Sequence, residues 1–355
     1  MSLPCPKARS VRAARKGPNG RGMGSIGLPN NLEIDMASTA TFARAPVRHG
    51  TTLLTLLASA MVLFSGTASS AAGASLTASA PTRVIEVGGN AIAYRDIGPK
   101  RGTPLLLINR FRGTMDNWDP KLIDKIAAER RVIMFDQPGF ARSTGTPPDN
   151  LKLFASTAVA VARQLGIDTF DVLGFSMGGT VALQLVLDNP SLVRRAVIAG
   201  SLPGFVPGDV PSNKPAGNEV WSVATKPVNS DEDFLFLFFE PTETSQKAGR
   251  EYLARLAQRK DAFVKQVEAA AWQAQLKSAS GVREEATTLL PRLKEIEQPV
   301  FVANGRHDIM APTYASYAMV QALPNGWLKV YPDAGHGFLF QYPEEFGEDV
   351  LRFLR

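Results

Sequence analysis

Beyond residue 80, short apolar runs alternate with longer segments in which apolar positions recur every three to four residues. The first two runs, Arg83–Val87 and Ala91–Asp96, alternate apolar and polar residues around Gly88-Gly89-Asn90, which is typical of a β-hairpin. The later runs are continuously apolar, as in strands that a parallel sheet buries on both faces. We predict such strands at Leu105–Asn109, Arg131–Phe135, Asp171–Gly174, Arg195–Ala199, Val300–Asn304 and Leu328–Tyr331.

Helical patterns separate these strands. We predict helices at Lys121–Glu129, Leu151–Leu165, Gly178–Asp188, Thr313–Leu323 and Pro343–Arg355. Gly166 and Pro190 come directly after two of them, where helices commonly end. The alternation of strands and helices predicts an α/β fold, with a mostly parallel sheet flanked by helices on both faces.

The alternation is interrupted once, between Pro203 and Pro291. This stretch contains a Pro- and Gly-rich entry, an aromatic-rich segment at Asp231–Glu240 and a helical pattern over Ala248–Ala274. We therefore expect a helical cap at residues 205–290, inserted into a core formed by residues 81–204 and 291–355. Most of the aromatic rings should pack within the cap, with one or two lining an apolar pocket.

The charge of the chain is concentrated at its N-terminal end. The sequence has 39 Lys and Arg against 33 Asp and Glu, and residues 1–80 alone carry eight of the basic and two of the acidic ones. The remainder is therefore balanced, at 31 of each sign. A protein that tracks phosphates needs an excess of basic residues, so we expect no nucleic-acid partner.

The N-terminal segment is typical of an export leader. Residues 36–74 contain Arg44 and Arg48, then the apolar run Leu53–Phe64, then small residues that end in Ala72-Gly73-Ala74. This layout predicts a signal peptide with cleavage before Ser75, and thus an exported protein, periplasmic or secreted. Cleavage after the second match, Ala78-Ser79-Ala80, would leave Pro81 first. An uncleaved leader acting as a membrane anchor is the alternative.

Residues 1–35 are basic and rich in Gly and Pro, as disordered extensions are, and Met36 is an alternative start. The one cysteine, Cys5, lies here, and only His307 and His336 follow the leader. A cysteine- or histidine-based metal site is therefore not expected. No nucleotide or flavin motif is present, and we predict no cofactor.

The pentapeptide Gly174-Phe175-Ser176-Met177-Gly178 matches the pattern G-x-S-x-G. It lies between a predicted strand and a predicted helix, the setting in which a sharp turn lifts the serine clear of the sheet. The small residues at both ends allow the close backbone approach that such a turn needs. Ser176 is therefore the candidate nucleophile, and the Met177 N–H at the helix start is a candidate oxyanion donor.

His336 lies between two glycines on the loop after the last predicted strand, which suits a general base. Asp308 follows the strand Val300–Asn304 and can orient the imidazole. The chain order Ser176, Asp308, His336 is the order found in α/β hydrolases. Asp333 and, less so, Asp209 are rival acids, but Asp333 lies three residues before the histidine and more plausibly shapes a turn.

With these motifs, the stretch from Arg83 to Arg355 resembles the α/β-hydrolase superfamily, in its cap-containing serine hydrolases. It is most similar to the esterase/lipase and non-haem haloperoxidase-like (perhydrolase) members. The matching segments are Phe135–Ser143, Gly174–Gly179, Asn304–Asp308 and Gly335–Gly337. The resemblance implies an α/β-hydrolase fold and the triad Ser176, Asp308 and His336.

The resemblance also implies that the second oxyanion donor is the backbone N–H of Phe111. Two positions depart from the family pattern: Asn109-Arg110 stands in place of His-Gly, and Ala141 in place of a glycine. Arg110 and Arg112 would stand near the pocket mouth, where they could favour an anionic substrate. We expect instead that both are hydrated loop charges, because long cationic side chains beside solvent usually are.

These residues predict a serine hydrolase that cleaves a carboxylic ester or related acyl bond of a small molecule through an acyl-enzyme. Perhydrolase or haloperoxidase-like activity on the same triad is one alternative. A slow-turnover ligand-binding receptor on this fold is another. The serine at position 176 excludes the halide- and epoxide-opening relatives, which use an aspartate nucleophile. The sequence leaves the oligomeric state open.

Overall fold

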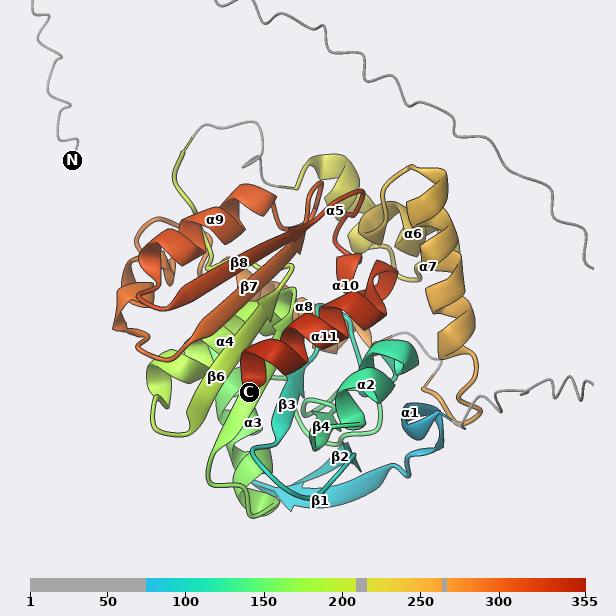
Figure 1. Ribbon diagram of the computed structural model, residues 1–355, viewed down its shortest axis with the longest axis vertical. Helices are drawn as coiled ribbons and strands as arrows, with labels where there is room; N and C mark the ends of the chain where they lie inside the picture. The colour runs from blue at the N-terminus through green and yellow to red at the C-terminus, as the bar shows by residue number, and fades with distance from the viewer. Residues whose placement is uncertain (1–74, 209–215, 264–266) are drawn as a thin grey trace, which may run out of the picture. The chain divides into compact units, whose positions relative to one another are not determined.

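The computed structural model describes residues 75–208, 216–263 and 267–355, so the predicted leader and basic extension lie outside the described residues. The described chain forms an eight-stranded sheet with the order β1-β2-β4-β3-β5-β6-β7-β8 (Figure 1). The pairs β1–β2 and β2–β4 are antiparallel, and the others are parallel. The strands are β1 Arg83–Val87, β2 Asn90–Ile97, β3 Leu105–Ile108, β4 Val132–Phe135, β5 Phe170–Phe175, β6 Val193–Ala199, β7 Val300–Gly305 and β8 Gly326–Tyr331.

The predicted hairpin and all the predicted strands are confirmed. Gly88 and Gly89 connect β1 to β2 with φ angles of 59° and 81°, and such positive angles at both turn positions favour glycine. The predicted helices are confirmed as α2 Pro120–Ala127, α3 Leu151–Gln164, α4 Met177–Asp188, α9 Thr313–Ala322 and α11 Pro343–Leu354. Two further helices, α1 Leu76–Ser79 and α10 Phe338–Gln341, were not predicted, because each has only four residues and shows no clear periodicity.

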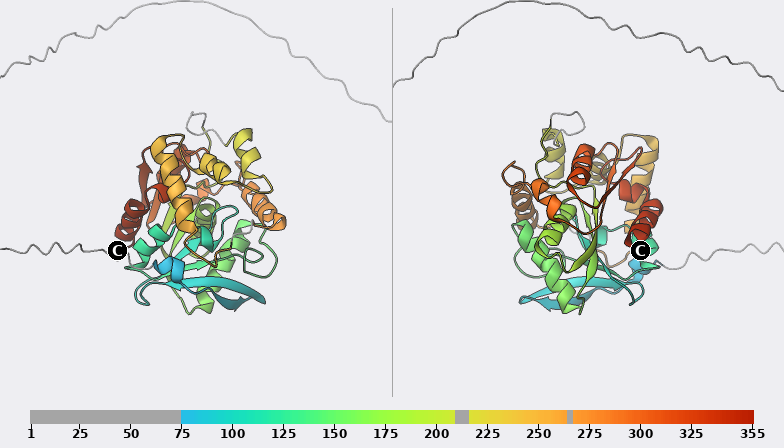
Figure 2. Two further views of the ribbon diagram at one scale, coloured as in Figure 1. Left: turned by 90° about the vertical axis from the view of Figure 1, so that its right-hand side faces the viewer. Right: turned by 60° about the vertical axis from the view of Figure 1, so that its left-hand side comes forward.

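Alternate residues of the central strands pack into two separate cores, one on each face of the sheet. Leu105 and Leu107 of β3 pack with α2 and α11, whereas Leu106 and Ile108 pack with α3 and α4. Figure 2 shows the helices on both sides of the sheet. Because both faces are covered at the middle of the sheet, β3 and β4 are apolar and buried throughout, which is why the sequence displays them as continuous runs.

The cap lies between β6 and β7 and contains α5 Asn218–Ala224, α6 Asp231–Phe238, α7 Glu243–Leu256 and α8 Ala269–Ser280. Its helices gather at one end of the sheet (Figures 1 and 2). The helical pattern predicted over Ala248–Ala274 corresponds to parts of two helices, because α7 ends at Leu256 and α8 begins at Ala269. Of the described residues between these helices, Arg259 and Phe263 contact the core.

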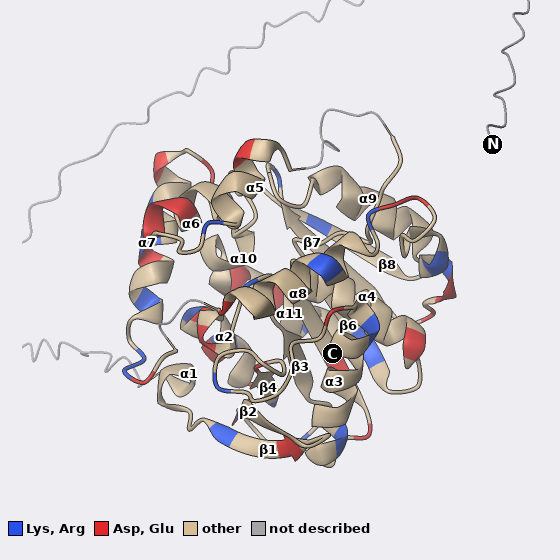
Figure 3. Cartoon of the chain, turned by 180° about the vertical axis from the view of Figure 1, so that it is seen from behind, with Lys and Arg blue, Asp and Glu red and all other residues tan. Residues whose placement is uncertain are grey.

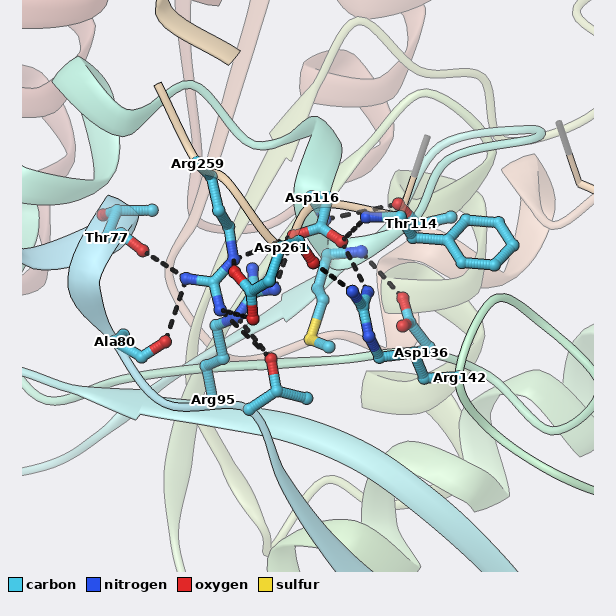
Figure 4. Close-up of polar contacts among 12 residues, drawn as sticks. Thr77, Ala80, Arg95, Thr114, Asp116, Asp136, Arg142, Arg259 and Asp261 are labelled. Carbon is cyan, nitrogen blue, oxygen red and sulfur yellow. Dashed lines mark hydrogen bonds and ion pairs between the residues drawn. The ribbon is translucent and has the colours of Figure 1, made fainter. Parts of the chain in front are cut away.

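Asp116 is the centre of these contacts. It lies after β3 and forms ion pairs with Arg95 of β2, Arg142 of the loop after β4 and Arg259 of the cap (Figure 4). The backbone N–H of Phe263 also donates to Asp116 Oδ2, at 2.7 Å. One buried carboxylate therefore joins the sheet to the segment between α7 and α8.

Arg259 extends this connection to the first described residues. Its Nη1 donates to the carbonyl oxygens of Thr77 and Ala80, at 3.1 and 2.9 Å (Figure 4). Thr77 in turn donates from its N–H and its hydroxyl to Asp124 of α2. The short helix α1 is thus held against both the cap and the core.

Charged residues of both signs are interspersed over the described part of the chain (Figure 3). Carboxylates gather on α6 and α7, where Asp231, Glu232 and Asp233 form the first turn of α6. Among the described residues, no helix is both long and apolar enough to cross a membrane.

Candidate active site

Ser176 occupies a strained turn between β5 and α4. Its φ of 57° and ψ of −125° lie in a region that residues with a side chain rarely adopt. The flanking glycines explain how the turn is tolerated. A Cβ atom at Gly174 would lie 2.1 Å from the carbonyl oxygen of Gly178, and one at Gly178 would lie 2.2 Å from that of Ile108. This is the strand–turn–helix setting that the sequence predicted for the serine.

The three predicted triad residues form one hydrogen-bonded chain. His336 Nε2 lies 2.8 Å from Ser176 Oγ, and His336 Nδ1 lies 2.7 Å from Asp308 Oδ2. An ionised carboxylate can only accept, so Nδ1 carries the proton and Nε2 accepts from the serine hydroxyl. This is the tautomer in which imidazole can remove a proton from Ser176.

Two loops hold the acid and the base together. The carboxylate of Asp308 accepts from the N–H groups of Met310 and Ala311, both at 2.8 Å. The N–H of His307 donates to the carbonyl of Ala334, which joins the loop after β7 to the loop after β8. The Asp308 and His336 side chains are almost fully buried, so water does not compete for their hydrogen bond.

The rival acid Asp333 lies elsewhere. Its carboxylate accepts from the hydroxyls of Thr242 and Thr244 in the cap, at 2.8 and 2.7 Å. Its φ of 46° is that of a turn residue, as the sequence analysis expected. The other rival, Asp209, lies outside the described residues.

The two predicted oxyanion donors flank the serine. Phe111 and Met177 line the same small cavity as Ser176, and neither N–H has a hydrogen-bond partner among the described residues. Both N–H groups are thus available to an oxyanion, in keeping with the roles predicted for them. The loop of Phe111 is held by Gln275 of α8, whose side-chain oxygen accepts from the N–H of Arg112 at 2.8 Å.

Comparison with known proteins agrees with this geometry. The family model described as "alpha/beta hydrolase fold" matches residues 103–343. The chain belongs to this alpha/beta hydrolase family. A solved alpha/beta hydrolase fold protein from Chitinophaga pinensis is 36% identical, with a TM-score of 0.72, and the match covers 78% of this chain and 98% of that one.

Two curated relatives of this hydrolase show the range of the family. The pimeloyl-(acyl-carrier protein) methyl ester esterase of Nitrosomonas europaea is 29% identical over 69% of this chain and 93% of its own length. The non-heme chloroperoxidase of Streptomyces lividans is 28% identical over 75% of this chain and 97% of its own length. The chain is therefore a hydrolase of this fold, with both esterases and haloperoxidases among its relatives.

Two cavities meet at Ser176. The larger, of about 570 Å³, is lined by His336, by Arg110 and by residues of α6 and α7. The smaller, of about 100 Å³, lies on the Met177 side and is closed by Trp221 and by Leu276 of α8. His336 lines only the larger cavity, so the two sides of the serine differ in both size and chemistry.

The expectation that Arg110 and Arg112 are hydrated is wrong. Arg112 is 8% exposed, and its guanidinium donates to the carbonyls of Ala224, Lys226 and Pro227 in the cap. Arg110 is partly buried and lies over the rings of Phe234 and Phe238. The cap packs against this loop, so Arg112 is buried and Arg110 is only partly exposed.

The two departures from the family pattern also have structural explanations. Asn109 holds its loop by donating to the carbonyl of Phe135 at 3.0 Å and accepting from the indole N–H of Trp118 at 2.7 Å. Ala141 adopts a φ of 47°, the left-handed region that favours the glycine of the family pattern. A non-glycine residue tolerates this conformation at a cost of about 1–2 kcal/mol.

Gln275 and Met310 also contribute to the site, although no sequence motif predicted them. Gln275 supports the loop of Phe111, and Met310 lines both cavities while its N–H donates to Asp308. A glutamine within a helical pattern and a methionine on a loop carry no motif of their own. Their roles depend on neighbours that are distant in sequence.

Proposed function

We propose that this hydrolase cleaves carboxylic esters of small molecules through an acyl-enzyme on Ser176. The observation that carries the proposal is the hydrogen-bonded chain from Ser176 through His336 to the buried Asp308, at the wall of a cavity. Ser176 Oγ attacks the ester carbonyl while His336 Nε2 takes its proton. The N–H groups of Phe111 and Met177 stabilise the oxyanion.

In the next step, His336 returns the proton to the oxygen of the leaving alcohol. A water molecule then attacks the acyl-enzyme, with His336 again acting as base, and the carboxylic acid leaves. Asp308 stabilises the imidazolium that forms in both halves of the reaction.

The two cavities suggest how the ester is oriented. The leaving oxygen must face His336, so the alcohol part occupies the cavity of about 570 Å³ and the acyl part the cavity of about 100 Å³. At roughly 30 Å³ for each water-sized group, the smaller cavity holds about three to four carbon atoms. The preferred substrate is therefore an ester of a short acid with a larger alcohol.

Activity-based labelling tests the proposal. A fluorophosphonate should modify Ser176 stoichiometrically, and Ser176→Ala should lower turnover of p-nitrophenyl esters by ~10⁴–10⁶-fold because the loss is chemical. The variant should unfold at the same temperature as the wild type. Labelling at another residue, or normal turnover of the variant, would show that the triad assignment is wrong. Tight ligand binding with a single turnover would instead indicate a receptor.

The similarity to a chloroperoxidase supports a second candidate activity on the same triad. Hydrogen peroxide in place of water would attack the acyl-enzyme and release a peroxy acid, which oxidises bromide. Peracid formation from acetate and hydrogen peroxide at a rate comparable with ester hydrolysis would favour this activity. A rate of peracid formation several orders of magnitude below the rate of ester hydrolysis would instead favour the esterase activity.

We further propose that the protein is exported after cleavage before Ser75. Cleavage after Ala80 would remove α1 together with the carbonyls of Thr77 and Ala80 that Arg259 binds. Expression in a bacterium with the native leader, followed by N-terminal sequencing, tests this. A mature protein that begins near Ser75 outside the cytoplasm is expected, whereas an intact leader on a membrane-bound protein would indicate an anchor.

A further inference from the structure

The arginines that line the larger cavity differ in how their charges are compensated. Arg259 pairs with Asp116 and Asp261, and Arg112 binds three carbonyl oxygens of the cap. Arg110 forms no ion pair with any described residue. Its guanidinium carbon lies 5.0 and 5.4 Å from the ring centres of Phe238 and Phe234, so aromatic faces take the place of a carboxylate.

The hydrogen-bonding capacity of Arg110 is also incompletely used. Its Nη1 donates to the carbonyl of Phe111 at 2.8 Å, and its side chain contacts the hydroxyl of Tyr252. Its Nε is buried and has no hydrogen-bond partner among the described residues. Gly113 makes room for this arrangement, because a Cβ atom there would lie 2.7 Å from Arg110 Cγ.

A partly buried cation without a counter-ion is unfavourable, and burial lowers the pKa of Arg110. The described carboxylates that line the same cavity do not offset this charge. Asp116 is already surrounded by three arginines, and Asp231 is exposed at the start of α6. The site thus contains a positive charge that an incoming anion would compensate.

Arg110 lines the cavity of Ser176 and His336 but not the smaller cavity on the Met177 side. We propose that Arg110 binds a carboxylate on the alcohol part of the substrate, so that the enzyme prefers esters whose leaving group is anionic. The inference rests on the proposed function, because it assigns the larger cavity to the leaving group. The guanidinium supplies the charge and the free donors that a carboxylate needs.

A positioning role is the competing explanation, since Arg110 also holds the carbonyl of Phe111, the residue whose N–H is the predicted oxyanion donor. The two roles differ in what they act on. A positioning residue affects kcat for every ester, whereas an anion-binding residue affects KM for the charged ester selectively.

The experiment compares esters that differ only in charge. The 3- and 4-acetoxybenzoates carry a carboxylate on the leaving group, and the corresponding acetoxybenzamides are neutral and of similar size. The wild type should hydrolyse at least one acetoxybenzoate with a kcat/KM ~10-fold or more above that of its amide, the size of a charge-assisted hydrogen bond. The preference should decline with added salt, because a partly solvated ion pair is screened.

Arg110→Met removes the charge but keeps an apolar side chain that can pack against the rings of Phe234 and Phe238. It should abolish the preference, mainly through KM of the charged ester, while Arg110→Lys should retain part of it. Arg250→Met is the matched control, because Arg250 is an exposed cation of α7 without a described ion pair. This control should leave the preference unchanged. If Arg110→Met does not fold, the lysine variant and the salt dependence of the wild type still test whether Arg110 binds the carboxylate.

Equal kcat/KM for the charged and neutral esters in the wild type would overturn the inference. An equal loss of kcat/KM for the charged and neutral esters in Arg110→Met would also overturn it, because it would indicate a positioning role. A loss of the preference in Arg250→Met as large as that in Arg110→Met would overturn it too, because it would indicate an effect of overall charge rather than of one site. These failures are distinct from failure of the proposed function. If the proposed function is wrong, no acetyl ester is hydrolysed and the fluorophosphonate does not modify Ser176.

Discussion

At the scale of single residues, the surroundings of each carboxylate decide its role. Asp308 and Asp333 follow strands of the same sheet edge, yet Asp308 contacts His336, whereas Asp333 contacts two threonines of the cap. The distinction lies in hydrogen-bond partners rather than in residue type.

Substitution of each acid by asparagine tests this assignment. Asp308→Asn should lower turnover by up to ~10⁴-fold, because the amide favours the wrong imidazole tautomer. Asp333→Asn should change turnover far less and lower the free energy of unfolding by about 1 kcal/mol, as expected for weakened hydrogen bonds. Kinetics and urea unfolding of both variants measure the two effects. The opposite ranking of turnover would move the catalytic acid to Asp333.

Asp136 is one of the buried carboxylates outside the triad. Its Oδ1 accepts from the N–H of Met115 at 2.8 Å, whereas its Oδ2 has no described partner. Burial, with a smaller contribution from the nearby Asp116, raises the pKa of Asp136 from 3.8 to about 7. Between these two values the folded state keeps a proton that the unfolded state has released.

The free energy of unfolding contributed by Asp136 should therefore fall as pH rises from about 4 to about 7, and level off above that range. Asp136→Asn removes the titration and keeps an acceptor for Met115. Relative to this variant, the wild type should lose stability from pH 5 to pH 8, by at most about 1.4 kcal/mol per pH unit. Urea unfolding of both proteins at four pH values measures the difference. A difference that does not change with pH would show that Asp136 is ionised throughout.

At the scale of elements, the cap is held to the core by buried ionic contacts as well as by apolar packing. Arg259 joins the end of α7 to Asp116 and to the carbonyls beside α1. Arg255 of α7 pairs with Asp119 at the start of α2, at 2.7 Å. Two arginines near the end of one helix therefore fix the side of the cap that borders the larger cavity.

Removal of one of these contacts tests their energetic weight. Arg259→Met should lower the free energy of unfolding by about 1–3 kcal/mol, because several buried acceptors lose their donor. Arg292→Met breaks an exposed pair with Glu295 three residues along and should cost below about 1 kcal/mol. Chemical denaturation of both variants gives the comparison. Equal effects would mean that the Asp116 cluster contributes no more than a surface pair.

Helix α8 closes the smaller cavity and so should set the acyl length. Each added methylene is worth ~0.8 kcal/mol until the cavity is full, so kcat/KM should rise by ~10-fold from acetyl to butyryl esters and then fall. Leu276→Ala enlarges this cavity and should move the optimum to longer chains. A series of p-nitrophenyl esters measures both profiles. An unchanged optimum in the variant would place the acyl chain elsewhere.

At the scale of the whole molecule, the sheet brings together residues that are far apart in the chain. Ser176 and His336 are 160 residues apart and are joined by a 2.8 Å hydrogen bond. The strands β5, β7 and β8 run parallel, so the loops that follow them, which carry Ser176, Asp308 and His336, leave the sheet at the ends of the strands on the same side. The cap then covers this edge and divides the space above Ser176 into two cavities.

The sequence by itself determined the order of strands along the chain, the long helices of the core and the three residues that form the hydrogen-bonded chain Ser176–His336–Asp308. These features depend on local patterns: continuous apolar runs for buried strands, and glycines around a serine or a histidine on a loop. Only the tertiary structure decided the burial and contacts of Arg110 and Arg112, the separation of α7 from α8, and the two cavities at Ser176. Each of these depends on partners more than a hundred residues away, such as Phe238 for Arg110 and Asp116 for Arg259. Local periodicity indicates whether a position is buried. It does not indicate which distant residue contacts that position, because those contacts form only when the helices and strands pack together.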